Sequence, residues 1–261
     1  MEEIIEINNS GAASVTTNAI SVKQLKVSYR HTAILKDVSL NVSPGEFFGL
    51  VGVNGAGKST FIKALLDFID VDSGELTIFG VNSAATKARE SLAFLPERFV
   101  APYYLTGEEF IDYMLSLHGV AQKRGTEDKV EAMAAALDLR ISSLKESVRN
   151  YSKGMTQKLG LAACFLSGKK LLVLDEPMSG LDPKARVLVK RQLLALKAKG
   201  TTVFFSSHLL ADVEELADRM TILHQGELPF TGTPAECIDL HQTDNLETAF
   251  IRCIDAEALS S

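Results

Sequence analysis

The sequence predicts an α/β fold built around a mostly parallel sheet. Apolar runs at residues 46–53, 170–174 and 201–207 are short, and each one precedes a longer segment with helical periodicity. Strands that are apolar throughout are typical of parallel sheets, because helices cover both faces of such sheets. Between about residues 100 and 150 the pattern becomes helical only, which predicts a helical insertion into the α/β core.

The helical insertion carries its own start signal. Thr106 and Glu109 have the spacing of a capping box, in which each side chain bonds the other residue's backbone N–H. An apolar stripe at helical spacing follows it. The stripe consists of Phe110, Tyr113, Met114 and Leu117.

The two ends of the chain are less informative. The first twenty residues are polar and rich in small side chains, so we expect a flexible tail before a first strand near Val22. The last thirty residues show no clear period. The expected organisation is a tail over residues 1–20, one domain over 21–232 with its insertion at about 100–150, and an extension over 233–261.

The composition suits a globular protein and excludes several functional classes. The net charge of −6 gives no global basic field, so we expect no nucleic-acid partner. The acidic N-terminus does not resemble a signal peptide, and no apolar stretch approaches the ~18 residues needed to span a bilayer, so we expect a soluble chain. Cys164, Cys237 and Cys253 are far apart, and reduced thiols in a cytosolic protein account for them most simply.

A glycine-rich motif follows the first apolar run. Gly52, Gly57, Lys58 and Ser59 form the pattern Gly-x-x-x-x-Gly-Lys-Ser between a strand and a helix. Glycines let the backbone aim its N–H groups inward, and the following helix contributes its positive end. We expect Lys58 to reach the terminal phosphates of a nucleoside triphosphate and Ser59 to coordinate Mg²⁺.

Two acidic residues end the second apolar run. Asp175 and Glu176 lie at the carboxyl end of an expected parallel strand, where α/β sheets bind their ligands. Asp175 can hold Mg²⁺, and Glu176 can deprotonate an attacking water, a role worth ~10²- to 10⁴-fold in rate. A solvated strand end is the alternative. The phosphate-binding motif upstream favours hydrolysis or transfer of the terminal phosphate.

With these motifs in order, residues 22–232 resemble the ATP-binding subunit of an ABC transporter. The signature of that family, usually Leu-Ser-Gly-Gly-Gln, begins a helix about twenty residues before the acidic strand, and here it reads YSKGM at residues 151–155. Ser152 and Gly154 match the family, whereas Lys153 replaces a glycine. The serine hydroxyl, the first N–H groups of the helix and the ammonium all attract a γ-phosphate. The alternative is an ordinary helix capped by Ser152.

The resemblance implies roles at four further places. Tyr29 matches the aromatic residue that stacks on adenine. Glu97 stands where the family generally has a glutamine that senses Mg²⁺ and the transmembrane partner, and a carboxylate there can also act through water. Residues 179–182, SGLD, match the loop that communicates across the dimer, and His208 matches the switch histidine that contacts the γ-phosphate.

The resemblance also implies a P-loop NTPase core with antiparallel strands near the N-terminus and an inserted helical subdomain. The expected catalytic residues are Glu176, His208 and Lys58. The expected nucleotide-binding residues are Tyr29, Gly52, Val53, Asn54, Gly55, Ala56, Gly57, Lys58, Ser59, Thr60, Ser152, Lys153 and Gly154. The expected Mg²⁺ ligands are Ser59, Asp175 and Glu97.

These features together predict an ATP-hydrolysing subunit that works as a head-to-tail dimer, either a homodimer or a pair with another ATPase subunit. It would lie on the inner face of the cell membrane and drive a separate permease. The YSKGM and LPE variants resemble bacterial export-type systems and favour export. One alternative is a soluble ABC-type ATPase acting as an assembly or DNA-associated scaffold. A P-loop GTPase or small-molecule kinase is the other, and no Asn-Lys-x-Asp element that would read guanine is present.

An aromatic-rich stretch, RFVAPYYL, precedes the helical insertion. Phe99, Tyr103 and Tyr104 could anchor a helix of the permease, because aromatic side chains often dominate interface energies. The alternative is that these rings pack the insertion onto the core.

Overall fold

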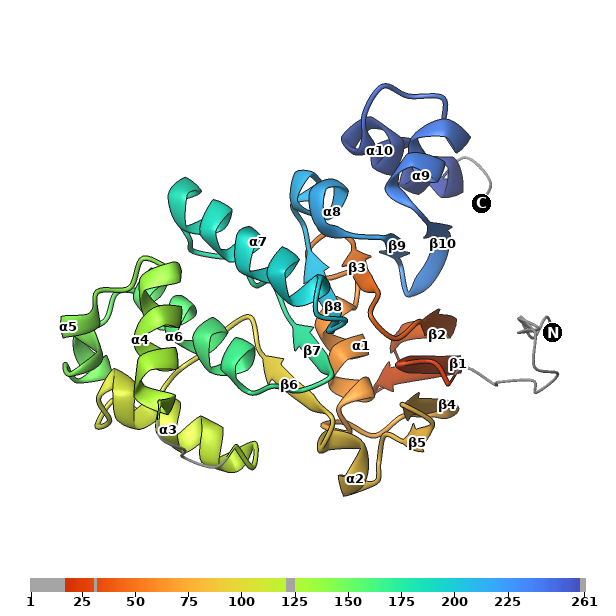
Figure 1. Ribbon diagram of the computed structural model, residues 1–261. Helices are drawn as coiled ribbons and strands as arrows, with labels where there is room; N and C mark the ends of the chain where they lie inside the picture. Colours follow the sequence, from red (N-terminus) through yellow and green to blue (C-terminus); the bar gives the residue numbers. More distant parts are fainter. Residues whose placement is uncertain (1–16, 31, 121–124, 259–261) are drawn as a thin grey trace, which may run out of the picture.

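The computed structural model describes residues 17–30, 32–120 and 125–258. Most of the expected N-terminal tail lies outside these residues. Two sheets organise the described chain, and most of the helices lie to one side of them or at the C-terminal end (Figure 1). The observed class is therefore α/β, as the sequence predicts.

A six-stranded sheet with the order β10-β9-β3-β8-β7-β6 forms the centre of the fold. Its strands are β3 (Phe47–Val51), β6 (Leu92–Leu95), β7 (Leu171–Leu174), β8 (Thr202–Ser207), β9 (Arg219–His224) and β10 (Glu227–Gly232). All neighbours pair in parallel except β10 with β9. β8 lies between β3 and β7, so the carboxyl ends of these three strands meet at one edge of the sheet.

A second sheet is antiparallel and has the order β2-β1-β4-β5. Its strands are β1 (Ile20–Tyr29), β2 (Thr32–Val42), β4 (Ser73–Ile78) and β5 (Val81–Asn82). Buried and exposed residues alternate along much of β2, as expected when one face is packed and the other is solvated. These strands confirm the antiparallel portion that was expected near the N-terminus. Helix α1 (Lys58–Leu65) packs its apolar face against this sheet and against the central one.

The helical side of the molecule lies between β6 and β7 in the sequence (Figure 1). It contains α3 (Gly107–Leu117), α4 (Thr126–Ala136), α5 (Ile141–Leu144), the 3₁₀ helix η1 (Val148–Asn150) and α6 (Lys153–Leu166). The capping box of Thr106 and Glu109 is formed. The predicted stripe is partly wrong, because Tyr113 and Leu117 are exposed. The packed face of α3 instead uses Phe110, Ile111 and Leu115.

The remaining helices are α2 (Thr86–Arg89), α7 (Pro183–Lys197), α8 (Leu210–Leu216), α9 (Pro234–Leu240) and α10 (Leu246–Ala258). None of the helices in the described ranges is long and apolar enough to cross a bilayer. All three cysteines lie in the part of the chain that the structure describes, and they are buried and not joined in disulfides, in agreement with the expected reduced thiols.

The sequence analysis missed both C-terminal helices. The sequence does contain helix-start signals for α9, because Thr233 and Glu236 form a capping box and Pro234 occupies the first turn. In α10, Leu246, Ala249 and Cys253 are buried at helical spacing.

Candidate nucleotide-binding and catalytic site

The phosphate-binding motif forms the turn between β3 and α1. Gly57 precedes α1 with a φ of +109°, a conformation that L side chains rarely adopt, and a β-carbon there would lie 3.2 Å from Cδ2 of Leu35. No side chain caps the first turn of α1, so the helix leaves backbone N–H groups free for an anion. The motif therefore has the geometry that the sequence predicts for a phosphate-binding loop.

Lys58 begins α1, and its ammonium group is buried inside the loop. Nζ donates hydrogen bonds to the carbonyl oxygens of Gly52 at 2.7 Å and Val53 at 3.3 Å. It also lies 3.7 Å from Oε1 of Glu176. The loop thus holds a buried positive charge against its own backbone, and phosphate oxygens would be stronger partners for that charge than neutral carbonyls.

Asp175 follows β7 and receives hydrogen bonds from two hydroxyls. Ser59 Oγ donates to Oδ2 at 3.0 Å, and Ser206 Oγ donates to Oδ1 at 2.5 Å. Burial raises the pKa of Asp175, and the negative charges of Glu97 and Glu176 raise it further, against the lowering effect of the two hydroxyls. A cation beside Asp175 would therefore favour the ionised carboxylate.

The oxygen atoms of Ser59 and Asp175 suit Mg²⁺, which prefers hard oxygen ligands and usually takes only one or two from the protein. Within the described ranges, no group of three or more His, Cys, Asp or Glu side chains could form a complete metal cage. Two protein oxygens with phosphate and water completing the shell would satisfy Mg²⁺. Glu97 influences Asp175 electrostatically, but its metal contact stays a prediction.

Glu176 connects the phosphate loop to His208. Its carboxylate is buried, with Oε2 2.7 Å from Nδ1 of His208 and Oε1 facing Lys58. Its backbone N–H donates to Ser206 Oγ at 2.9 Å, and its φ is +51°. A non-glycine residue in this conformation is strained, and such strain is found where function fixes a side chain. Glu176 is therefore held rigidly at the edge where a terminal phosphate would lie.

Ser206 is a site residue that the sequence analysis missed. Its hydroxyl accepts from Glu176 N and donates to Asp175, so one side chain orients both acidic residues. The available signal was its position, because it is a hydroxyl residue near the carboxyl end of strand β8, two residues before His208.

The signature segment lies apart from this cluster within one chain. Ser152 caps α6, and its Oγ accepts from Met155 N at 3.2 Å. The structure thus forms the helix cap and brings Lys58, Ser59, Asp175, Glu176 and His208 together. No described hydrogen bond or ion pair joins Ser152, Lys153 or Gly154 to them.

Tyr29 ends β1 and is 46% exposed. Its ring therefore has a free surface on which a base could stack, and its adenine contact stays a prediction.

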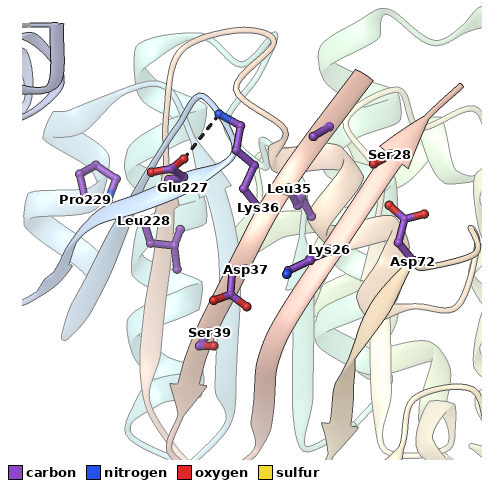
Figure 2. A pocket seen from close by; sticks show the side chains of 11 residues that line it. Lys26, Ser28, Leu35, Lys36, Asp37, Ser39, Asp72, Glu227, Leu228 and Pro229 are labelled. Atoms are coloured by element: carbon purple, nitrogen blue, oxygen red, sulfur yellow. Dashed lines mark ion pairs between the residues drawn. The ribbon is translucent and has the colours of Figure 1, made fainter. Parts of the chain in front are cut away.

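A cavity of about 800 Å³ lies elsewhere, along β1, β2 and β10 (Figure 2). Lys26, Asp37, Asp72 and Glu227 are among its lining residues, and Glu227 pairs with Lys36 at 3.5 Å. None of the phosphate-loop or acidic residues lines it. Its mixed charges select no particular ligand, so we assign the chemistry to the cluster around Lys58.

The fold and the cluster define a P-loop nucleotide-binding protein of the α/β class. Residues 35–179 match the family described as ABC transporter. An uncharacterized ABC transporter ATP-binding protein of Synechocystis is 41% identical over 78% of this chain and 58% of its own length. The chain belongs to the ABC transporter family, and its described part has the fold of an ABC-type ATPase domain.

Two further comparisons agree with membership of the ABC transporter family. The Nod factor export ATP-binding protein I of Rhizobium etli is 34% identical over 85% of this chain and 70% of its own length. A solved ATP-binding subunit of an ABC transporter is 30% identical, with a TM-score of 0.84 that covers 90% of this chain and 99% of that one. The chain spans less than two thirds of the length of the Synechocystis relative.

Proposed function

We propose that this protein binds and hydrolyses ATP as the motor subunit of an ABC transporter. The observation that carries the proposal is the buried cluster in which Glu176 bridges Lys58 and His208 beside Asp175. Lys58 and the loop N–H groups bind the phosphates, and Ser59 and Asp175 hold Mg²⁺. Mg²⁺ held there would supply positive charge to offset that of the phosphate oxygens.

In this mechanism Glu176 acts as the general base. Its carboxylate accepts a proton from a water molecule that attacks the γ-phosphate, while His208 orients the carboxylate and faces the same phosphate. Because Ser206 and Lys58 fix Glu176 from two other sides, the base needs little rearrangement before reaction.

We further propose that two copies, or this chain and a paired subunit, sandwich each ATP head to tail. The phosphate loop of one subunit would face the signature helix of the other. The support is geometric: α6 presents a second helix N-terminus, with Ser152 and Lys153 exposed, and no described hydrogen bond or ion pair joins these two residues to the phosphate loop of their own chain.

The proposed permease-facing surface consists of Tyr103, Tyr104 and a neighbouring cavity of about 560 Å³. Tyr103 and Tyr104 are 69% and 72% exposed, and Tyr103 lines the cavity together with Glu97. Phe99 also lines this cavity, but it is partly buried, and its ring centroid lies 5.5 Å from that of Phe110 in the core. The two tyrosines, rather than Phe99, are the available anchors for a partner helix.

This function places the protein on the inner face of the membrane, beside a separate permease. The name of the Rhizobium relative supports export as the direction. A soluble scaffold would use the same ATPase but would not bind a membrane protein. Copurification of a membrane-spanning partner with the tagged full chain therefore distinguishes the two.

The test of the ATPase itself is Glu176→Gln, which keeps size and polarity but removes the base. Turnover should fall by at least ~10²-fold while ATP binding persists. Undiminished hydrolysis would remove Glu176 from the role of base.

A further inference from the structure

Helix α8 begins two residues after His208, and ion pairs tie it to α7. Nζ of Lys190 on α7 lies 2.7 Å from Oδ1 of Asp212 and 2.5 Å from Oε2 of Glu215, and both acidic residues belong to α8. The side chains of Lys190 and Asp212 are only 14% and 7% exposed. Burial lowers the pKa of Lys190, but the hydrogen bonds and charges of Asp212 and Glu215 outweigh burial and raise it. The pair is therefore charged and little screened by solvent.

Asp212 lies in the first turn of α8, and hydrogen bonds connect this turn to the segment that carries His208. Asp212 N donates to the carbonyl oxygen of Leu209 at 3.1 Å, and Leu209 N donates to Oγ of Ser207 at 3.0 Å. These bonds join residues on both sides of His208. A shift of Asp212 would therefore also move the backbone at His208.

His208 depends on this backbone for its position. Among the described residues, its ring hydrogen bonds only to Oε2 of Glu176, and its side chain is 45% exposed. Val213 of α8 lies over the bare backbone of β3, because a β-carbon on Gly49 would be 3.0 Å from its Cγ1. Packing on glycine holds the helix down on the strand but resists sliding poorly. Polar contacts such as that of Lys190 therefore fix the place of α8 along β3.

A second lysine of α7 forms a comparable pair beyond the other end of α8. Nζ of Lys197 lies 2.6 Å from Oδ1 of Asp218, and Oδ2 of Asp218 accepts a hydrogen bond from Phe47 N at 2.9 Å. Asp218 follows the last residue of α8 by two positions and His208 by ten. The two pairs thus hold opposite ends of α8, and the Lys190 pair lies at the end next to His208.

We propose that Lys190 is a positioning residue for ATP hydrolysis, which fixes the first turn of α8 through Asp212 and so holds His208 against the carboxylate of Glu176. This inference rests on the proposed function, in which Glu176 is the base and His208 orients it. Lys190 itself acts on no reacting atom. Its loss should slow turnover and leave ATP binding intact.

The first test compares Lys190→Met with Lys197→Met in the full chain. Each variant keeps an aliphatic side chain and loses one ion pair of α7, so Lys197→Met controls for lost stability. Lys190→Met should lower kcat by roughly five- to tenfold at unchanged KM and ATP affinity, because small misplacements of a catalytic group are costly. Lys197→Met should stay within about twofold of the wild type. Lys190→Arg, which keeps the charge, should recover turnover to within about threefold.

Urea titrations establish that each variant is folded under the assay conditions. If Lys190→Met does not fold, Lys190→Gln replaces it with the same expectations, because its amide can still hydrogen bond to Asp212 without supplying a charge. Glu215→Gln removes the more exposed partner of Lys190 and should change turnover by less than about twofold.

The second test asks whether Lys190 acts through His208. In a His208→Ala background, Lys190→Met should lower turnover by less than about a further twofold, because the ring that it positions is gone. An equal effect of Lys190→Met with and without His208 would show that the lysine acts by another route, and the inference would be wrong.

The remaining outcomes separate this inference from the proposed function. If His208→Ala slows turnover and Lys190→Met does not, the positioning role of Lys190 is wrong and the proposed base stands. The same holds if Lys190→Met and Lys197→Met slow turnover equally. If neither His208→Ala nor Glu176→Gln affects turnover, the proposed function fails and the inference fails with it.

Discussion

Nδ1 of His208 lies 2.7 Å from Oε2 of Glu176, while Oε1 of the same carboxylate lies 3.7 Å from Nζ of Lys58. The three side chains follow three adjacent strands, β8, β7 and β3. The parallel pairing of these strands brings together residues that are up to 150 positions apart in the sequence. Each of the predictions about turnover depends on this contact.

His208→Ala should slow ATP hydrolysis by ~10- to 10²-fold, because Glu176 loses the group that orients its carboxylate. ATP binding to the single subunit should change little, since the loop N–H groups and Lys58 are untouched. Turnover and nucleotide affinity, measured on the same preparation, check both statements. Wild-type turnover in the variant would show that the 2.7 Å contact has no catalytic role.

Lys58→Met should mainly weaken ATP binding, whereas His208→Ala should mainly slow turnover. Removing the ammonium takes away the charge that meets the phosphates, so ATP affinity should fall by at least ~10-fold. Isothermal titration with ATP, compared with Glu176→Gln, measures this. Equal affinity in Lys58→Met and the wild type would exclude phosphate binding by Lys58.

The sequence predicted several residues that the structure brings together, because they lie at the ends of apolar strands or in the glycine-rich loop between β3 and α1. Their catalytic and binding roles stay predictions. Asp175 and Glu176 follow one such run, and His208 follows another. Ser206 could not be distinguished in the same way, since its importance comes from two hydrogen bonds between strands that are distant in sequence. Local patterns reveal strand ends but not which hydroxyl faces a neighbouring carboxylate.

The helical insertion also shows that local sequence patterns predict helix ends better than tertiary contacts. The capping box of Thr106 and Glu109 is a local signal and was predicted correctly. The packed face of α3 depends on how the helix rests against α6, and periodicity alone placed Tyr113 and Leu117 on the wrong side. The closeness of the Lys153 side chain, at the start of α6, to Gly180 is likewise a tertiary feature that no spacing in the sequence indicates.

The buried cysteines give a prediction about pH. Burial raises the pKa of Cys164 to about 12 and that of Cys237 to about 11. The folded protein keeps these thiols protonated where the unfolded chain ionises, so their contribution to stability is complete below about pH 9 and declines as the pH rises toward 12. The free energy of unfolding from urea titrations should therefore fall between pH 9 and 11.

A matched measurement tests the same thiols directly. Iodoacetamide at pH 8 should leave Cys164 and Cys237 of the native protein unmodified, and unfolding in urea should expose both to alkylation. Rapid modification of either residue in the native protein would contradict the burial and the raised pKa.

Tyr103→Glu with Tyr104→Glu should detach the protein from membranes that contain the proposed permease, because a helix packed on the two rings would have to bury two unpaired charges. Basal ATPase activity should remain within about twofold. Leu240→Glu is the control, since Leu240 is 65% exposed on α9, outside this surface. Unchanged membrane association of the double variant would assign the permease-facing surface elsewhere.

The composite ATP site predicts complementation between two defective chains. A Lys58→Ala chain mixed with a Ser152→Arg chain forms dimers in which both lesions fall in one site and the other site is intact.

With Glu176→Gln in both chains to suppress turnover, such mixed dimers should trap one ATP each, while either chain alone should trap far less. Size-exclusion chromatography with labelled ATP gives the stoichiometry, and differently tagged chains verify that subunits exchange. If exchange occurs and mixing restores no ATP-dependent dimer, the signature does not act across the interface. Ser152, whose Oγ accepts from Met155 N at 3.2 Å, would then serve only to cap α6.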